Sequence, residues 1–328
     1  MSFWKNKQVL VTGAGGFIGS HLAEELVREG AKVRAMVHYN ALAQWGWLNH
    51  SDLASQIEVY SGDITDRDST RNAMEGRDVV FHLAALIAIP YSYRAPGSYV
   101  RTNIEGTMNV LQAARELKTP KVVHTSTSEV YGTARFVPIS EAHPLQGQSP
   151  YSASKIGADK MAEAFHLSYG VPVTTVRPFN TFGPRQSARA VIPSIIAQCL
   201  KGQTVKLGSL TPTRDFNYVA NTVDGFLKAG ASEKSVGRAF NFGTGREISI
   251  GDLVQLISKL TGKPIDLQTE ENRLRPEGSE VERLLADASA AREALGWTPE
   301  ISLEEGLTRT IAWIEQNQAK YRADVYNV

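Results

Sequence analysis

The residues best suited to chemistry lie in one stretch of the chain that ends at Lys155. The apolar run K-V-V-H-T-S predicts a strand, and Thr127, Ser128 and Glu129 stand at its end. Tyr151 and Lys155 follow at Y-x-x-x-K spacing near the start of an expected helix, where residues four apart share a face. We expect the Lys155 ammonium to favour the phenolate and to lower the tyrosine pKa from its usual value of about 10. Tyr151 is therefore a candidate base, and Glu129 is a second acid–base group.

A glycine motif, G-x-x-G-x-x-G, directly follows the short apolar strand expected at residues 8–11. A helical pattern begins after it and ends at Gly30. Glycines let the backbone turn tightly and approach a diphosphate, and a helix N-terminus adds free N–H groups. A strand, glycines and a helix in this order predict a dinucleotide-binding loop. We assign to this loop Gly13, Gly16, Phe17, Ile18 and Gly19.

The second expected strand, A-K-V-R-A-M-V, is followed by H-Y-N. It lacks the acidic residue that commonly grips the adenosine ribose of NAD at this place. Without that acidic residue, nothing at this strand end excludes NADP. His38 or Arg34 would meet the 2′-phosphate of NADP. We expect NADP rather than NAD. In the alternative, Asn40 and the backbone hold the ribose of NAD.

Two further strands add contacts to the expected cofactor. The third, I-E-V-Y-S-G-D-I-T, ends with Asp63 and Ile64, which we place near the adenine. The fourth, D-V-V-F-H-L-A-A, is apolar on both faces, as strands of a parallel sheet are. Its end contributes Leu83, Ala84 and Ala85 to the cofactor site.

The alternation of strands and helices predicts an α/β protein. We expect a Rossmann-type, doubly wound parallel sheet and a smaller, interleaved C-terminal α/β domain that binds the substrate. The cofactor domain is expected at 1–178, with a returning strand near 238–243. The substrate domain is expected at 179–237 and 244–328.

The loop 86–97 follows the carboxyl end of a strand, which is where open parallel sheets bind ligands. Tyr91, Ser92 and Tyr93 in this loop are therefore candidates for substrate contact. Asn103, in the first turns of a helix expected over 99–117, is another.

The segment 41–56 contains two tryptophans, and an amphipathic helix over the adenosine edge or a dimer contact would fit it. Several residues are typical of helix starts. They are the pair Thr65 and Asp68, and the N-cap candidates Ser249, Asp287 and Ser302.

The composition excludes several classes of function. Lys+Arg 35 against Asp+Glu 34 gives a net charge of +1, so neither nucleic-acid nor membrane-surface binding is expected. No apolar run fits a signal peptide or a membrane span, and a cytoplasmic location is expected. Cys199 is the only cysteine, so an intramolecular disulfide is excluded and core packing is expected. The seven histidines show no metal-type spacing, and His82 is expected to be structural.

Motifs along nearly the whole chain resemble the extended short-chain dehydrogenase/reductase family of nucleotide-sugar epimerases and dehydratases. They are T-G-x-x-G-F-I-G-S, G-D-I, H-L-A-A, S-T-S-E-V-Y-G, Y-x-x-S-K, R-P-F-N, R-D-F-x-Y-V, N-F-G and R-P-E. The resemblance implies that Tyr151 takes the proton from a sugar 4-hydroxyl while Thr127 holds that hydroxyl. It also implies that Lys155 binds the nicotinamide ribose of a tightly held, internally recycled cofactor.

The resemblance places the substrate as well. Asn180, Arg214 and Arg275 match positions that hold a nucleotide diphosphate, and guanidinium groups pair well with phosphate. The alternatives are an ion pair of Arg214 with Asp215 and a solvated position for Arg275. The segments that match the nucleobase lining are Val191 to Ser194 and Lys206 to Leu207. A homodimer through a four-helix bundle of 99–117 and 150–169 is also implied.

Glu129 separates the reactions of this family. In its 4,6-dehydratases a T-D-E or T-S-E motif supplies a glutamate that removes the C5 proton, which simple 4-epimerases do not need. Ser128 replaces the aspartate that often protonates the C6 hydroxyl, which leaves Glu129 itself or a water on Ser128 as the donor. UDP-glucuronate decarboxylases share T-S-E-V-Y-G but would need a basic residue near the carboxylate, where the loop offers only Arg94.

The loop and the T-S-E motif together look most like the dehydratases of legionaminic-acid-type pathways, which act on nucleotide-linked N-acetylglucosamine. We therefore expect a UDP- or GDP-N-acetylglucosamine 4,6-dehydratase. The alternatives are a UDP-sugar 4-epimerase, a UDP-glucuronate decarboxylase and a 5,6-ene-forming dehydratase.

Overall fold

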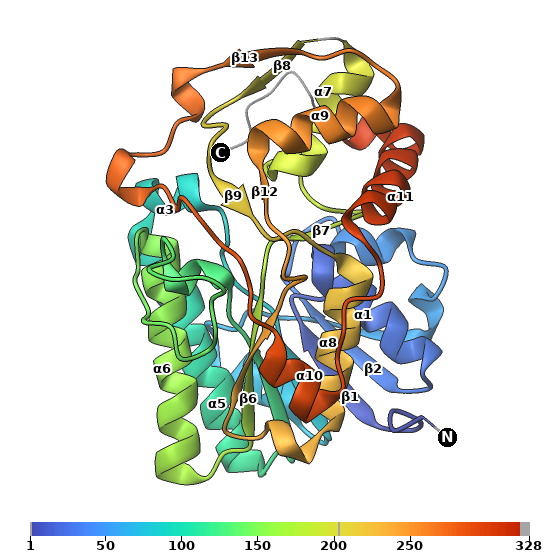
Figure 1. Cartoon of the computed structure of the whole chain (residues 1–328). Helices are drawn as coiled ribbons and strands as arrows, with labels where there is room; N and C mark the ends of the chain where they lie inside the picture. The colour runs from blue at the N-terminus through green and yellow to red at the C-terminus, as the bar shows by residue number, and fades with distance from the viewer. Residues whose placement is uncertain (1, 203, 322–328) are drawn as a thin grey trace.

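A parallel sheet of seven strands forms the centre of the molecule (Figure 1). The computed structural model describes residues 2–202 and 204–321. The strand order is β11-β6-β5-β4-β1-β2-β3, and all neighbours are parallel. The strands are β1 (Gln8–Thr12), β2 (Lys32–Val37), β3 (Ile57–Ser61), β4 (Val79–His82), β5 (Lys121–Thr125), β6 (Val173–Pro178) and β11 (Ala239–Phe242). This is the expected Rossmann-type, doubly wound α/β fold.

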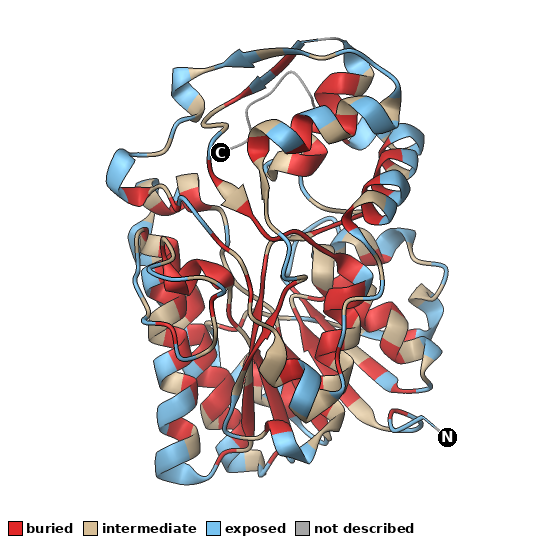
Figure 2. Ribbon diagram, in the orientation of Figure 1, coloured by how far each residue is buried: buried red, intermediate tan, exposed pale blue. Residues whose placement is uncertain are grey.

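Both faces of the sheet are covered, which is why its strands read as continuous apolar runs. In β1, Val9 and Val11 belong to the core on one face and Leu10 to the core on the other. Figure 2 shows the buried residues concentrated on the strands and on the inward sides of the helices. One face carries α1 (Phe17–Arg28) and α8 (Val219–Ala231), and the other carries α2 (Arg67–Met74), α5 (Gly106–Leu117) and α6 (Pro150–Tyr169).

The helix expected over 99–117 is interrupted. It consists of α4 (Pro96–Tyr99), a π-helical turn at Val100–Glu105 and α5. Such π turns insert an extra residue and are frequent at functional sites. Helix α6 has the expected range of 150–169, and Ser149 begins it with a capping box to Ser152.

The smaller part of the chain lies beyond the carboxyl ends of the strands (Figure 1). It contains the helices α7 (Val191–Lys201), α9 (Ile250–Thr261) and α11 (Leu303–Gln316). Its strand pairs are β8 (Thr204–Leu207) with β13 (Asp266–Thr269), β9 (Thr213–Arg214) with β12 (Ile248–Ser249), and β10 (Asn217–Tyr218) with β7 (Thr181–Phe182). Cys199 is fully buried in its core.

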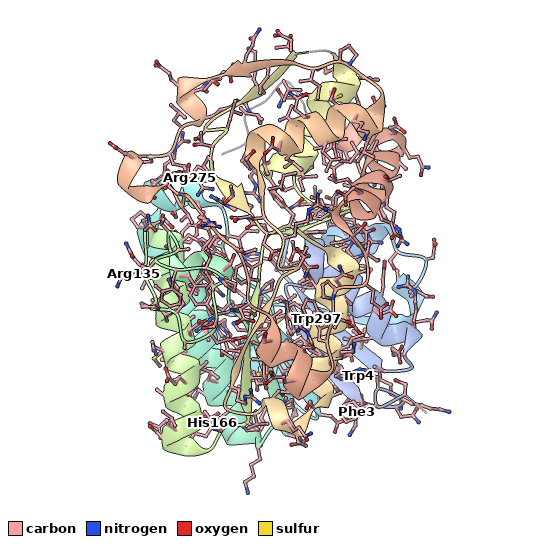
Figure 3. All side chains as sticks on the ribbon, in the orientation of Figure 1. Phe3, Trp4, Arg135, His166, Arg275 and Trp297 are labelled. Atoms are coloured by element: carbon pink, nitrogen blue, oxygen red, sulfur yellow. The ribbon has the colours of Figure 1, made fainter. Side chains whose placement is uncertain are left out.

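The chain passes between the two parts more than once. β11 pairs with β6 in the sheet, and α10 (Ser289–Leu295) follows further along the chain. Trp297 packs its ring 4.9 Å from that of Phe242 in β11. In Figure 3, Trp297 lies near the middle of the molecule, whereas Arg275 lies near α3 (Ile89–Arg94). Because the chain crosses between the two parts in this way, we propose the expected division into a cofactor domain and an interleaved substrate domain.

Several local expectations are wrong. The segment 41–56 is not an amphipathic helix but two 3-10 turns, η1 (Gly46–His50) and η2 (Ala54–Gln56). Positive φ angles at Ala43 (48°) and Gly46 (61°) break any continuous helix. Part of the expected loop 86–97 is helical, as α3.

The helix starts are a mixed result. Ser249 and Ser302 cap α9 and α11, as expected. Helix α2 is capped by Asp66, whose side chain accepts from the Ser69 N–H, and not by the expected pair. Asp287 lies one residue before the N-cap of α10, although its carboxylate accepts from the Ser289 N–H. In the described parts of the chain, no helix is long and apolar enough to span a membrane.

The hydrogen bonds of Asp215 join it to the chain segments after β11 and before α10, and replacing Asp215 tests how much they stabilise the protein. Its buried carboxylate accepts hydrogen bonds from the N–H groups of Thr244, Gly245 and Ala286. Asp215→Ala leaves these donors unpaired, so we expect a loss of about 3 kcal/mol of unfolding free energy in urea denaturation. Asp224→Ala, which removes a surface ion pair to Lys228, is the control and should cost less than about 0.5 kcal/mol. A loss below about 1 kcal/mol for Asp215→Ala would contradict this account.

Candidate active site

The end of β5 holds the first group of predicted catalytic residues. Thr127 is the N-cap of a 3-10 turn (Ser128–Tyr131), and its Oγ1 accepts from the Glu129 N–H at 3.2 Å. Ser128 and Glu129 are buried, with 2% and 8% exposure. Beyond its charge interactions, the Glu129 carboxylate has no hydrogen bond or ion pair to another described side chain. A buried carboxylate without such a partner is available for proton transfer.

Tyr151 lies in the first turn of α6, beside this group. Its ring packs edge-on against Tyr99, with centroids 6.3 Å apart. Burial raises the pKa of the Tyr151 phenol well above its usual value; a hydrogen bond with Thr127 acts to lower it, and the charge of Glu129 raises it further. Thr127, Glu129 and Tyr151 therefore share one site, as predicted.

The expected lowering of the Tyr151 pKa is wrong for this structure, because burial raises that pKa. Lys155 is itself buried, and burial lowers its pKa to about 8 while the charge of Asp159 acts against this shift. Its Nζ donates to the Thr125 carbonyl at 2.6 Å. Desolvation thus disfavours both charged forms, the ammonium of Lys155 and the phenolate of Tyr151.

Sequence reasoning missed Asp159, although it lies four residues after Lys155 on the same helix. Its carboxylate is buried and accepts charge-assisted hydrogen bonds. Oδ1 meets His124 Nε2 at 3.1 Å, and Oδ2 accepts from Ser126 Oγ at 2.8 Å and from Arg177 Nη2 at 3.1 Å. Its spacing of four residues from Lys155 could have indicated that the two side chains lie on the same face of the helix. Asp159 joins α6 to β5 and β6 directly beneath the catalytic group.

His82 is structural, as expected. Its Nδ1 lies 2.9 Å from Thr12 Oγ1 and its Nε2 lies 3.1 Å from Thr107 Oγ1. Burial lowers its pKa well below the usual value. Across the described residues, no group of three or more metal-type ligands comes together.

The glycine loop fits a dinucleotide diphosphate. Gly13 has φ +69°, and a Cβ there would lie 2.8 Å from the Ala84 N. A Cβ on Gly19 would collide with the Gly13 carbonyl. Helix α1 has Gly16 as its N-cap and no side-chain cap, so its first N–H groups are free for an anion.

The remaining residues of this cradle lie where they were predicted. Phe17 and Ile18 begin α1. Leu83 and Ala84 follow β4, and their N–H groups both donate to Thr12 Oγ1 at 3.1 Å, with Ala85 next in the chain. The strand end and the glycine loop are therefore held together around the space for a cofactor.

The adenosine end departs from expectation in part. Arg34 is occupied by an ion pair with Glu58 at 2.8 Å and by the Ala73 carbonyl, so it cannot meet a 2′-phosphate as predicted. His38 is 79% exposed and lies 3.4 Å from the Asp63 carboxylate. Only His38 supports the NADP expectation.

Two other predicted cofactor contacts serve the protein itself. The Asn40 side chain closes its own loop, since Oδ1 accepts from the N–H groups of Leu42 and Gln44. The Ile64 side chain is buried in the core, where it lies against Gly106. Contact of Ile64 with a cofactor would have to use its backbone.

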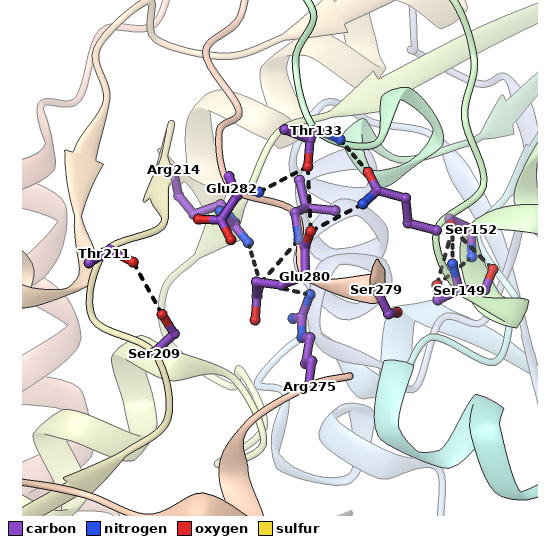
Figure 4. Close-up of polar contacts among 12 residues, drawn as sticks. Thr133, Ser149, Ser152, Ser209, Thr211, Arg214, Arg275, Ser279, Glu280 and Glu282 are labelled. Carbon is purple, nitrogen blue, oxygen red and sulfur yellow. Dashed lines mark hydrogen bonds and ion pairs between the residues drawn. The ribbon is translucent and has the colours of Figure 1, made fainter. Parts of the chain in front are cut away.

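The diphosphate candidates lie on the opposite side of the site. The Oδ1 of Asn180 is buried without a hydrogen-bond partner among the described residues, which is typical of a group that awaits a ligand. Arg214 is buried and donates to Glu280 Oε1 at 3.3 Å, and Arg275 pairs with the same oxygen at 3.5 Å (Figure 4). Arg214 therefore does not pair with Asp215, and Arg275 is held rather than fully solvated.

Glu280 is the second residue that sequence reasoning missed. It follows Arg275 by five residues, just beyond the motif R-P-E, and was not singled out in the sequence. Burial lowers the pKa of Arg214, and the charges of Glu129 and Glu280 oppose that shift. The predicted base and the predicted diphosphate clamp thus interact electrostatically. Val191, predicted to line the nucleobase, is the first residue of α7.

The substrate-loop candidates divide into free and structural residues. Tyr91 is 40% exposed and remains a candidate. Ser92 is fully buried and donates to the Ile89 carbonyl, and the Tyr93 hydroxyl lies 2.6 Å from Ser279 Oγ. Both are structural.

The assignment of Asn103 to substrate binding is wrong. Its Oδ1 accepts from the Leu86 N–H, and its Nδ2 donates to the Leu86 carbonyl and to Ser154 Oγ. All of its polar groups are occupied, so it positions the loop after β4 instead of contacting a ligand.

A Rossmann sheet with Thr127, Tyr151 and Lys155 at its carboxyl edge is typical of the short-chain dehydrogenase/reductase class. Comparison with known proteins agrees. The family described as GDP-mannose 4,6 dehydratase matches residues 10–310. The chain belongs to this family of extended short-chain dehydrogenases/reductases, whose members are NAD-dependent nucleotide-sugar dehydratases and epimerases.

Individual relatives carry different activities. The chain is 34% identical over 310 residues to the UDP-glucose 4-epimerase of Mycolicibacterium smegmatis, covering 93% of this chain and 97% of that one. It is 34% identical over 325 residues to the UDP-N-acetyl-alpha-D-glucosaminuronate decarboxylase of Bacillus cytotoxicus, covering 94% and 98%. The structure of DesIV, a dTDP-glucose 4,6-dehydratase of Streptomyces venezuelae with NAD bound, superposes with a TM-score of 0.88 at 29% identity, covering 96% and 99%.

The pKa of Lys155 gives a pH-dependent prediction. Its pKa is about 8 in the folded protein and 10.5 in the unfolded chain, so between these pH values the unfolded state binds more protons. Unfolding free energy contributed by this site therefore rises with pH in that window. Relative to Lys155→Met, the wild type should gain roughly 3 kcal/mol from pH 8 to 10.5 in denaturant titrations. A pH-independent difference between the two proteins would contradict the burial of a charged lysine.

Proposed function

We propose that this protein is a nucleotide-sugar 4,6-dehydratase, a lyase that acts on UDP- or GDP-linked N-acetylglucosamine. The observation that carries the proposal is the buried carboxylate of Glu129, which shares the site with Tyr151 and Thr127. An epimerase needs only one proton-transfer group at C4, whereas loss of water from C6 needs a second base at C5.

The residues divide the steps between two carbons of the sugar. Tyr151 takes the proton of the 4-hydroxyl, which Thr127 orients, and Lys155 binds the ribose of the cofactor. When bound, a nicotinamide cofactor would supply the hydride acceptor for C4 and the hydride donor for C6. Between these steps, the C4 ketone acidifies the C5 proton, and Glu129 removes it.

Glu129 also supplies the proton for the leaving hydroxyl in this proposal. After taking the C5 proton it is a carboxylic acid, and it gives that proton to the C6 oxygen as the C6–O bond breaks and water leaves. The alternative donor is a water molecule held by Ser128. Addition of hydride at C6 then requires a proton at C5, which Glu129 returns after it has taken a new proton from water.

The main alternative is decarboxylation, because a decarboxylase is among the relatives. That reaction calls for a basic residue near the C5 carboxylate. The only such residue of the expected substrate loop, Arg94, is exposed at the end of α3. We therefore favour dehydration over decarboxylation, and over 4-epimerisation on the strength of Glu129.

The proposal also includes a cofactor preference and an oligomeric state. The preference for NADP depends on His38 alone. Mass spectrometry of the dinucleotide released from the purified protein tests this preference, and the presence of NAD alone would refute it.

A cytoplasmic homodimer is also proposed. Its interface would be α5 and α6 with the π-helical turn, which expose Val100, Met108 and Leu167. Sedimentation as a monomer at micromolar concentration would refute the dimer.

Replacing Glu129 tests the proposed reaction. In deuterated water, the wild type should release product that carries deuterium at C5, as seen by NMR. Glu129→Gln should lower the rate of water loss by at least about a hundredfold, because the C5 base is gone, while oxidation at C4 persists. Unchanged turnover in Glu129→Gln would refute the assignment.

Ser128→Ala is the matched control within the same turn. If Glu129 carries both proton transfers, this variant should keep its rate within about tenfold of the wild type. A loss as large as that of Glu129→Gln would move the proton-donor role to Ser128.

A further inference from the structure

The segment after β2 lies directly on the dinucleotide-binding loop. A Cβ on Gly15 would lie 2.7 Å from the Trp45 carbonyl, and a Cβ on Gly46 would collide with the Gly15 carbonyl. The Trp47 N–H donates to that same carbonyl at 3.0 Å. Two backbones meet here at a distance that only glycine allows on either side.

The side chain of Trp47 packs against helix α11, near the C-terminal end of the described chain. The rings of Trp47 and Trp313 in α11 meet edge to face, with centroids 5.4 Å apart, and Lys320 Nζ lies 5.0 Å from the Trp47 ring. Trp313 also packs against Tyr321, whose hydroxyl donates to the Gln186 carbonyl at 2.9 Å. Figure 1 shows α11 beside the blue segment that follows β2.

In the segment after β2 (residues 38–50), the residues that pack closely against the rest of the protein lie in the second half. Tyr39 and Leu42 are 70% and 77% exposed. Leu48, in contrast, is 1% exposed, and Trp45 packs against the main core. The part that touches Gly15 is therefore the anchored part.

Gly15 belongs to the loop between Gly13 and Gly16 whose backbone fits the cofactor diphosphate. If the cofactor leaves by opening of this loop, opening must break the contact with the segment. We propose that Trp47, held in place by Trp313, is a positioning residue that keeps the dinucleotide-binding loop closed and slows release of the cofactor. Restraints of this kind act mainly on the dissociation rate. They also lower the entropy cost of binding, because the loop is already ordered before the cofactor binds.

This inference rests on dinucleotide binding, which the family shares, and not on the identity of the sugar. It explains in physical terms how a dinucleotide could be retained through many turnovers. A reaction that oxidises and then reduces the same substrate never needs to exchange its cofactor.

The test measures cofactor retention instead of activity. Purified protein is saturated with NAD or NADP, passed through gel filtration, and sampled over time for the dinucleotide that remains bound. Trp47→Ala and Trp313→Ala should each release it about three- to tenfold faster than the wild type, the size expected for one aromatic pair. The double variant should be no faster than the single ones, because both remove the same contact.

Two controls separate this role from general destabilisation. Ile314→Ala removes a fully buried side chain from the next position of α11; it should lower stability but keep the wild-type release rate. Trp47→Phe keeps an aromatic ring against Trp313 and should release the cofactor at nearly the wild-type rate. Wild-type release in both tryptophan-to-alanine variants, or equally fast release in Ile314→Ala, would overturn the proposal, whatever reaction the enzyme performs on its sugar.

Discussion

The buried charge of Asp159 constrains the geometry of the whole site. An isolated carboxylate in the protein interior would cost several kcal/mol, and here it is offset by His124, Ser126 and Arg177. These partners come from β5 and β6, so the interaction fixes α6 against the two strands whose ends carry the chemistry. The distance between Tyr151 and the Thr127 turn follows from this arrangement.

The same constraint keeps two proton-transfer groups apart. Tyr151 is fixed by α6, whereas Glu129 is fixed by the 3-10 turn after β5 and is influenced by the charge of Arg214. Arg214 shares Glu280 with Arg275. A diphosphate bound by these arginines would therefore alter the charge around Glu129 at the moment the substrate arrives. In the proposed reaction, substrate binding would therefore act on Glu129 through the charge of Arg214.

Local patterns predicted the sheet, the form of the glycine loop and the proximity of Thr127, Glu129 and Tyr151, because these depend on strand ends and short spacings. Long-range contacts were beyond such patterns. Asn103 was assigned to the substrate although it holds the loop at Leu86, and the pairing of Glu280 with two arginines was missed. The direction of the Tyr151 pKa shift was also wrong, because the spacing of Tyr151 and Lys155 shows their proximity but not the depth of their burial.

The central claim is that one sugar loses water while hydrogen moves within the molecule from C4 to C6. The most direct measurement uses nucleotide-linked N-acetylglucosamine that carries deuterium at C4, with NMR and mass spectrometry of the product. The account predicts loss of water and deuterium in the new C6 methyl group. Deuterium retained at C4, with or without loss of water, would contradict it and would favour epimerisation or a 5,6-ene product.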